Sequence, residues 1–494
     1  MLPNLADWII EHTADRAKPL LSTPSGEYSM EDIGRETIRY ENLLKPYGSL
    51  KGKKVGLLVP PVFHYLSLVF AVNRLGGVVV PISPYFRKED LGALLEFLDP
   101  HVVFTAEQYN GFPFAQAVKE WAGGSGKQTV LFRLSGDGKW TEEECEGVER
   151  PAEAIPAHII SCSSGSTGVP KGIMVTTSWF EHNKTALTLL HEFAPSDRLF
   201  SLVPAAGNYG LSVILAGLYN GVHVTVAESY DFPSLVKLMA EKGCNKLSAT
   251  PSLFKALALF AKHANPAALE RIELCALAGE PVRDDAFAVF SELPNCKFRN
   301  HYGMSELAGL LYSENDVRDG PDMKLLPGVS CKLVDSDGDT GEVAFKVASG
   351  FAGYYKRPDL TDEVFRDGWF YTGDIARLSE EDRIAIVGRI KDLIKKGGQQ
   401  VVPAEIERLL AAHPKVKQAV VVGAPHKILG EQIVAFIVPE RQLALQELYS
   451  YLEGRIAKYK VPDQLKLVEQ VPVSQGKIDK VTLRKLAAAE FGGV

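Results

Sequence analysis

The segment from Ser161 to Gly172, which reads SCSSGSTGVPKG, has the residue types needed to bind phosphate groups. Its three glycines allow the backbone to approach a ligand closely and to adopt positive φ angles. Its hydroxyl and backbone N–H groups could contact phosphate oxygens, and Lys171 supplies a positive charge. Because apolar residues precede and follow the segment, we expect a loop between two strands.

This loop is not a Walker A motif, which requires a Gly-Lys-Ser or Gly-Lys-Thr sequence leading into a helix. Val169 and Pro170 separate Gly168 from the lysine here, and Gly172 follows it. The alternative interpretation is a flexible Ser/Gly connector. The Pro-Lys-Gly sequence at the end of the segment favours a binding loop instead.

The loop resembles the T-S-G-[ST]-T-G-x-P-K-G motif of the adenylate-forming superfamily, which includes acyl-CoA synthetases, stand-alone adenylation domains and luciferases. Further segments match this family's motifs in the family's order, namely Gly279–Pro281, Asn300–Glu306, Tyr371–Asp374, 388–392 with 397–407, and 473–479. The resemblance covers residues 30–485. It implies an AMP-forming acid–thiol ligase that uses ATP and Mg²⁺ to convert a carboxylic acid to an acyl-adenylate, releasing pyrophosphate. The acyl group would then pass to CoA or to the phosphopantetheine of a separate acyl carrier protein.

The resemblance also implies a nucleotide site. Tyr302 would offer a flat face to adenine, with Gly303 permitting close approach, although a core tyrosine is the alternative. Ser305 would hold the α-phosphate. Asp374 would accept hydrogen bonds from the ribose hydroxyls, and Arg389 would donate to the sugar or a phosphate. The remaining nucleotide-binding candidates are Ser163, Ser164, Gly165, Ser166, Gly168, Lys171, Gly279, Glu280, Pro281 and Asn300.

Three residues are catalytic candidates under this resemblance. Glu306 would hold Mg²⁺, since magnesium prefers one or two carboxylates together with phosphate oxygens. Lys477 would reach the carboxylate and the α-phosphate during adenylation and stabilise the transition state electrostatically. Thr167, in the phosphate loop, is the third. The alternatives are a surface glutamate without a role and a solubilising lysine near the C-terminus, and Gln475 departs from the residues usual in that motif.

Lys391 occupies the family's hinge position, which implies that the C-terminal domain rotates after adenylation. This rotation would withdraw Lys477 and bring the loop at Gly397 and Gly398 toward the thiol. A hinge requires changes of φ and ψ in a few residues, and glycines permit them.

Residues 203–212 align with the segment that lines the acyl site in the family. Gly207 replaces the usual aromatic or histidine gate residue, which predicts a wider pocket. Asn208 and Tyr209 resemble the Asn-Tyr pair of aryl-acid-activating members, whose asparagine faces an ortho substituent of a benzoate. Ala278 and Gly279 would leave room for a ring or a short chain.

We therefore expect an aromatic acid, with a medium-chain aliphatic acid as the alternative. The neutral asparagine argues against α-amino acids. A regulatory homologue that binds nucleotide without catalysis is a rival hypothesis, but Lys477, Glu306 and Asp374 are all retained. No sequence feature selects a luciferase-like oxygenase.

Several segments must position these residues. Val55–Val59, Val78–Ile82 and Val102–Phe104 are apolar on both faces and alternate with helical segments. This pattern predicts an α/β fold with doubly wound, mostly parallel sheets. We expect residues 1–388 to form a large N-terminal domain that holds the ATP and acyl sites. Residues 389–494 would form a small, mobile α+β domain, with a helix at 403–412 and strands at 419–422 and 433–438.

Composition restricts the remaining possibilities. The chain has 494 residues and a formal charge of -7, which gives no reason to expect a nucleic-acid partner. Its six cysteines include no C-x-x-C pair and fit reduced thiols. No apolar run reaches the roughly 18 residues that suggest a membrane span, and no signal peptide is recognisable. We therefore expect a cytoplasmic protein without membrane association.

Overall fold

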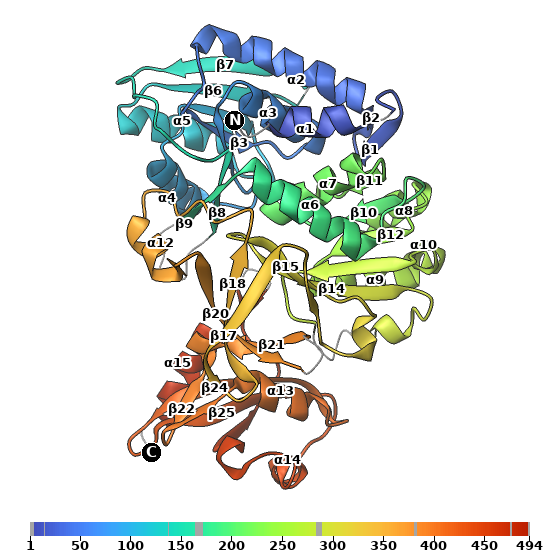
Figure 1. Cartoon of the computed structure of the whole chain (residues 1–494), viewed down its shortest axis with the longest axis vertical. Helices are drawn as coiled ribbons and strands as arrows, with labels where there is room; N and C mark the ends of the chain where they lie inside the picture. Colours follow the sequence, from blue (N-terminus) through green and yellow to red (C-terminus); the bar gives the residue numbers. More distant parts are fainter. Residues whose placement is uncertain are drawn as a thin grey trace.

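The structure is a computed structural model that describes residues 4–13, 15–136, 138–163, 171–282, 289–379, 383–474 and 477–492. The molecule is elongated, and the elements from β22 onward lie at the opposite end from the N-terminal helices (Figure 1). No helix in these ranges is long and apolar enough to cross a membrane.

The first sheet carries the phosphate-loop strands at one edge. Its order is β7 (Trp140–Cys145), β6 (Thr129–Leu134), β5 (Val102–Ala106), β3 (Lys54–Leu58), β4 (Val78–Pro81), β8 (Ile159–Ser163) and β9 (Lys171–Val175). Its inner strands are parallel, whereas β6–β7 and β8–β9 are antiparallel. Strand β3 is buried on both faces, as expected for a parallel strand between helices. The connecting helices are α2 (Met30–Leu44), α3 (Val62–Arg74), α4 (Lys88–Leu98) and α5 (Phe114–Ser125).

The second sheet has a parallel centre and antiparallel edges. Its order is β16 (Lys324–Leu325), β15 (Ala308–Tyr312), β14 (Lys297–Met304), β13 (Leu274–Ala278), β12 (Lys246–Ala249), β10 (Arg198–Ser201), β11 (His223–Val226), β1 (Pro19–Thr23) and β2 (Gly26–Ser29). Its helices are α1 (Leu5–His12), α6 (Thr177–His191), α7 (Asn208–Tyr219), α8 (Phe232–Glu241), α9 (Pro251–Ala264) and α10 (Pro266–Glu270).

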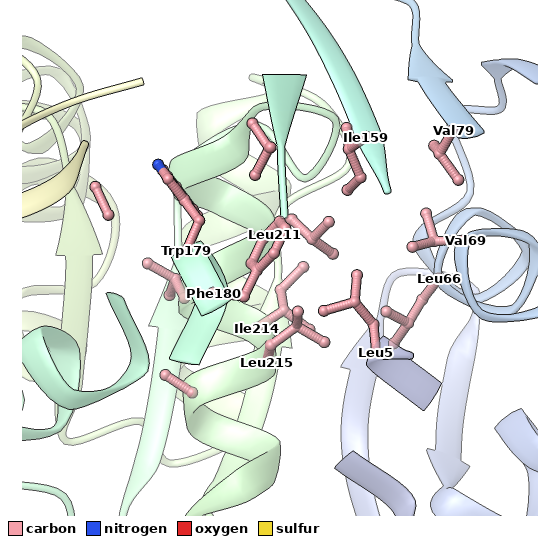
Figure 2. Close-up of a cluster of buried hydrophobic side chains, with 14 of the residues drawn as sticks. Leu5, Leu66, Val69, Val79, Ile159, Trp179, Phe180, Leu211, Ile214 and Leu215 are labelled. Carbon is pink, nitrogen blue, oxygen red and sulfur yellow. The ribbon is translucent and has the colours of Figure 1, made fainter. Parts of the chain in front are cut away.

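One apolar core joins these two sheets. Figure 2 shows Leu66 and Val69 of α3, Phe180 of α6 and Leu211 of α7 near Ile159 of β8. Helix α7 is apolar around nearly its whole circumference, which suits a helix buried between layers. The core therefore holds the start of α7 against the strand that enters the phosphate loop.

A third sheet is antiparallel and consists of β17 (Val329–Asp337), β18 (Thr340–Val347), β19 (Phe365–Arg366), β20 (Trp369–Leu378) and β21 (Ile384–Arg389), with helix α12 (Pro358–Val364) beside it. The predicted α/β class with mainly parallel sheets is confirmed, but this third sheet was not anticipated. Direct hairpins such as β17–β18 can join only antiparallel strands.

The C-terminal elements form a separate sheet. It contains β22 (Ile394–Lys396), β23 (Gln399–Val401), β24 (Val416–His426), β25 (Gly430–Pro439) and β26 (Gln464–Leu467). Helices α13 (Pro403–Ala411), α14 (Leu445–Leu452) and α15 (Lys480–Phe491) pack against it, and β27 (Val473–Ser474) pairs with β28 (Lys477–Ile478). The chain changes sheets between the ends of β21 and β22. The boundary at residues 388 and 389 stays a prediction.

Candidate active site

A cleft of about 1950 Å³ lies between the C-terminal elements and the second and third sheets. The C-terminal elements contribute Lys460 and Lys480 to its lining. Most of the described nucleotide-site candidates also line it, namely Gly279, Glu280, Pro281, Asn300, Tyr302, Gly303, Asp374 and Arg389. The structure therefore brings together residues from four separate sequence motifs.

Asp374 of β20 connects two of these residues. Its Oδ2 accepts a hydrogen bond of 2.5 Å from the Tyr302 hydroxyl, and its Oδ1 accepts one of 2.5 Å from Nε of Arg389. The backbone N–H of Asp374 donates to Oγ1 of Thr372, a contact that sequence reasoning missed. Since a carboxylate oxygen can accept more than one hydrogen bond, Asp374 is held in place and can still bind a ligand hydroxyl.

Tyr302 is fixed by the same contact. Burial, and then the neighbouring charge of Asp374, raises the pKa of the Tyr302 phenol well above its usual value, so the hydroxyl stays a donor.

The structure gives a second reason for glycine at position 303, besides the close approach of a ligand. A Cβ atom there would lie 2.5 Å from the carbonyl oxygen of Ala308, so the pairing of β14 with β15 already requires glycine.

Two other candidates have contrasting environments. The Oδ1 atom of Asn300 is buried, and no described residue donates to it. A buried acceptor without a donor is unfavourable, which suits a site that a ligand N–H completes. The Glu280 carboxylate instead accepts hydrogen bonds from the backbone N–H and the hydroxyl of Ser252, in the first turn of α9.

Glu306 lies in the turn between β14 and β15. The hydroxyl of Tyr354 donates to its Oε1 at 2.8 Å, and Nζ of Lys171 lies 5.7 Å from the centre of the Tyr354 ring. Sequence reasoning assigned no role to Tyr354. The Gly-Tyr-Tyr sequence at residues 353–355 was the only local signal, because the tyrosine and the glutamate are 48 residues apart.

A second, smaller pocket of about 280 Å³ lies at the start of α7. Gly207, Asn208 and Ser305 line it together with the aromatic residues Tyr65, Tyr85, Phe86 and Tyr230. Nδ2 of Asn208 donates to Oγ of Ser161 at 2.8 Å, so the amide spans from α7 to β8. Among the described residues, a Cβ atom at Gly207 would meet only the carbonyl oxygen of Pro204, at 3.4 Å, which agrees with an open pocket at this position.

The predicted acyl-site residues do not all share one pocket. Among the residues lining the two cavities, Gly279 belongs to the large cleft, whereas Tyr209 and Ala278 belong to neither. The Tyr209 ring lies 5.8 Å from that of His301, and Ala278 pairs with His301 across β13 and β14. Because Asn208 and Tyr209 are adjacent on a helix, their side chains point in different directions.

The hinge candidate Lys391 is exposed, lines the large cleft and lies in a short helical turn between β21 and β22. Its carbonyl oxygen accepts a hydrogen bond of 2.9 Å from Arg484 of α15. Gly397 and Gly398 have φ angles of 57° and 80°, a region that glycine adopts readily.

Some candidates fall outside the described residues. They are Ser164, Gly165, Ser166, Thr167 and Gly168 in the phosphate loop. For Ser163 and Lys477 only the backbone is described. Ser163 pairs with Lys171 at the end of the β8–β9 ladder, and Lys477 pairs with Ser474.

Comparisons with known proteins identify the family of the chain. Residues 13–355 match the family model of AMP-binding enzymes, and residues 405–476 match that of the AMP-binding enzyme C-terminal domain. The chain is 25% identical to a fatty acid–[acyl-carrier-protein] ligase of Streptomyces coeruleorubidus, over 92% of this chain and 90% of the relative. It is 27% identical to a feruloyl-CoA synthase of an Amycolatopsis species, over 92% and 93%. The ATP-bound structure of MatB from Rhodopseudomonas palustris superposes with a TM-score of 0.85 and 25% identity, over 99% of both chains.

Proposed function

Because the chain belongs to the family of AMP-binding enzymes, we propose that it activates an aromatic carboxylic acid with ATP and transfers the acyl group to a thiol. Its chemistry is that of an AMP-forming acid–thiol ligase. A carboxylate oxygen attacks the α-phosphorus of ATP, and the bond to pyrophosphate breaks. The thiol sulfur then attacks the acyl carbonyl, and AMP leaves.

The residues of the large cleft fit ATP. The acceptor Oδ1 of Asn300, which has no donor among the described residues, suits the amino group of adenine. The fixed ring of Tyr302 suits the face of the adenine. The oriented carboxylate of Asp374 suits the ribose hydroxyls, while Arg389 adds a positive charge. This prearranged set of groups is the observation that supports nucleotide binding here.

Glu306 is the residue that would bind Mg²⁺. Its carboxylate uses one oxygen to accept the Tyr354 hydrogen bond, and an acidic oxygen ligand of this kind suits Mg²⁺. A bound magnesium ion would neutralise phosphate charge during the reaction. Lys477 would supply a further positive charge to the acid and the α-phosphate from the mobile domain of residues 389–494. Rotation about Lys391 would then remove it before the thiol step.

The small pocket supports an aromatic substrate. Tyr65, Tyr85, Phe86 and Tyr230 contribute aromatic rings to its lining. A volume of about 280 Å³ suits a ring, and Asn208 places an amide in this wall. The first backbone N–H groups of a helix lack partners within the helix and favour an anion, so the start of α7 suits the acid's carboxylate. A medium-chain aliphatic acid is the alternative, which the similarity to a fatty acid ligase favours.

The thiol acceptor is CoA or the phosphopantetheine of a separate acyl carrier protein. The relatives named above include a CoA synthase and a carrier-protein ligase, so their names support both acceptors.

The decisive experiment is an ATP–pyrophosphate exchange screen with aryl, aliphatic and α-amino acids. We expect exchange that depends on an aromatic acid, followed by thioester formation when CoA or a phosphopantetheinylated carrier protein is added. Exchange only with straight-chain acids would overturn the aromatic assignment. An absence of exchange with every acid, in a protein that still binds ATP, would favour the regulatory hypothesis.

A further inference from the structure

Tyr354 contacts the carboxylate that the proposed function assigns to magnesium. The residue is only 6% exposed, and its hydroxyl donates to Oε1 of Glu306 at 2.8 Å. A hydroxyl that donates to a carboxylate forms a strong type of hydrogen bond.

The backbone around Tyr354 is anchored to β9, the strand that begins at Lys171. The N–H of Met174 donates to the carbonyl of Gly353 at 3.1 Å, and the N–H of Tyr355 donates to the carbonyl of Gly172 at 2.7 Å. These two bonds lie on either side of Tyr354. Its position is therefore tied to the strand that follows the phosphate-loop segment.

The ring of Tyr354 also contacts Lys171. The lysine Nζ lies 5.7 Å from the ring centre, within the range of a cation–π interaction. Among the described residues, the contacts of Lys171 and of Glu306 join each of them to Tyr354. Tyr354 thus contacts a cation through its ring and an anion through its hydroxyl.

We propose that Tyr354 is a positioning residue that orients Glu306 for the metal–nucleotide complex and links it to Lys171. This inference rests on the proposed function. A carboxylate held by one oxygen keeps its second oxygen in a defined direction, and loss of the hydroxyl leaves Glu306 free to rotate. The hydroxyl thereby favours binding of nucleotide with its metal over binding of nucleotide alone.

The test compares nucleotide binding with and without metal in Tyr354→Phe. We expect the calorimetric affinity for ATP in the presence of Mg²⁺ to fall about tenfold, the size of effect expected from one hydrogen bond to a charged group. The affinity for ATP in EDTA should not change. In pyrophosphate exchange, the half-saturating Mg²⁺ concentration should rise while the KM for the acid stays the same.

The adjacent tyrosine provides a matched control. The hydroxyl of Tyr355 donates to Glu153 at 2.6 Å and accepts from the buried Lys54 at 3.0 Å, so it contributes to packing elsewhere. Tyr355→Phe should lower the Tm without changing the metal dependence of ATP binding. When Tyr354→Phe is added to a Glu306→Gln variant, the metal dependence of ATP binding should not change further.

Three results would overturn the inference. The first is an effect of Mg²⁺ on ATP affinity that is the same in Tyr354→Phe as in the parent protein. The second is a change in this metal dependence that is equally large in Tyr355→Phe. The third is a change on adding Tyr354→Phe that is as large in the Glu306→Gln background as in the parent. These measurements of binding are separate from turnover. A parent protein that binds ATP with Mg²⁺ but exchanges pyrophosphate with no acid would contradict the proposed function alone.

Discussion

Tyr302 and Arg389 hold the Asp374 carboxylate from two sides, and the hydrogen bond from Tyr302 to Asp374 measures 2.5 Å. Tyr302→Phe keeps the ring but removes this donor. We expect the KM for ATP to rise about tenfold, because Asp374 loses one of the bonds that orient it toward the ribose. The KM for the acid should stay constant. Tyr312→Phe, on the neighbouring strand β15, is the control, and an equal effect there would indicate a general loss of packing.

The effect of replacing Asn208 should show which class of acid the protein activates. Its Nδ2 bonds to Ser161, which leaves the carbonyl oxygen as an acceptor for an ortho hydroxyl or amino group. Asn208→Ala should lower kcat/KM for the ortho-substituted benzoate about tenfold, since an unpaired buried polar group costs about 1–3 kcal/mol. Plain benzoate should be affected much less. A similar fall for both acids would contradict the aryl interpretation.

Ser161→Ala is a useful companion to this variant. It removes the partner of Asn208 without removing the amide itself, so it should weaken the preference for the ortho substituent only partly. An unchanged preference in Ser161→Ala would show that the amide is oriented by other groups.

Lys477→Ala should separate the two half-reactions. We expect adenylation to slow by about 100- to 1000-fold, the effect of removing one electrostatic contact to a transition state. Thioester formation from pre-formed acyl-adenylate should proceed at the parent rate. Lys485→Ala, at an exposed position of the following helix α15, is the comparison variant and should leave both half-reactions at the parent rate. Equal losses in both half-reactions of Lys477→Ala would contradict its assignment to the first step.

Lys391→Pro should restrict the hinge. Proline fixes φ near -65° and removes an N–H, and it also disfavours the helical conformation of the preceding residue, Ile390. We expect pyrophosphate exchange to continue while thioester formation slows about 100-fold, which corresponds to the ~3 kcal/mol typical of an incompatible proline. Lys391→Ala should leave both steps normal. Two normal half-reactions in the proline variant would show that the inferred rotation is unnecessary.

The sequence alone determined the class of the fold and the order of the functional segments. Strands such as β3 and β4 are apolar on both faces, so their burial between helices could be predicted from local pattern. In the C-terminal region, the predicted helix at 403–412 corresponds to α13 at Pro403–Ala411. The predicted strand at 419–422 is the centre of the longer strand β24. Its ends could not be predicted, because pairing with β25 extends it into polar residues.

Tertiary structure alone decided which side chains meet. Tyr354 reaches Glu306 across 48 residues, and Asn208 reaches Ser161 across 47, with no periodic pattern linking either pair. The sequence placed Asn208 and Tyr209 in one pocket, but the turn of α7 directs them to different surroundings. Local sequence sets which faces of an element are buried. The packing of whole sheets and helices sets which distant residues share a site, because each contact depends on the positions of several elements at once.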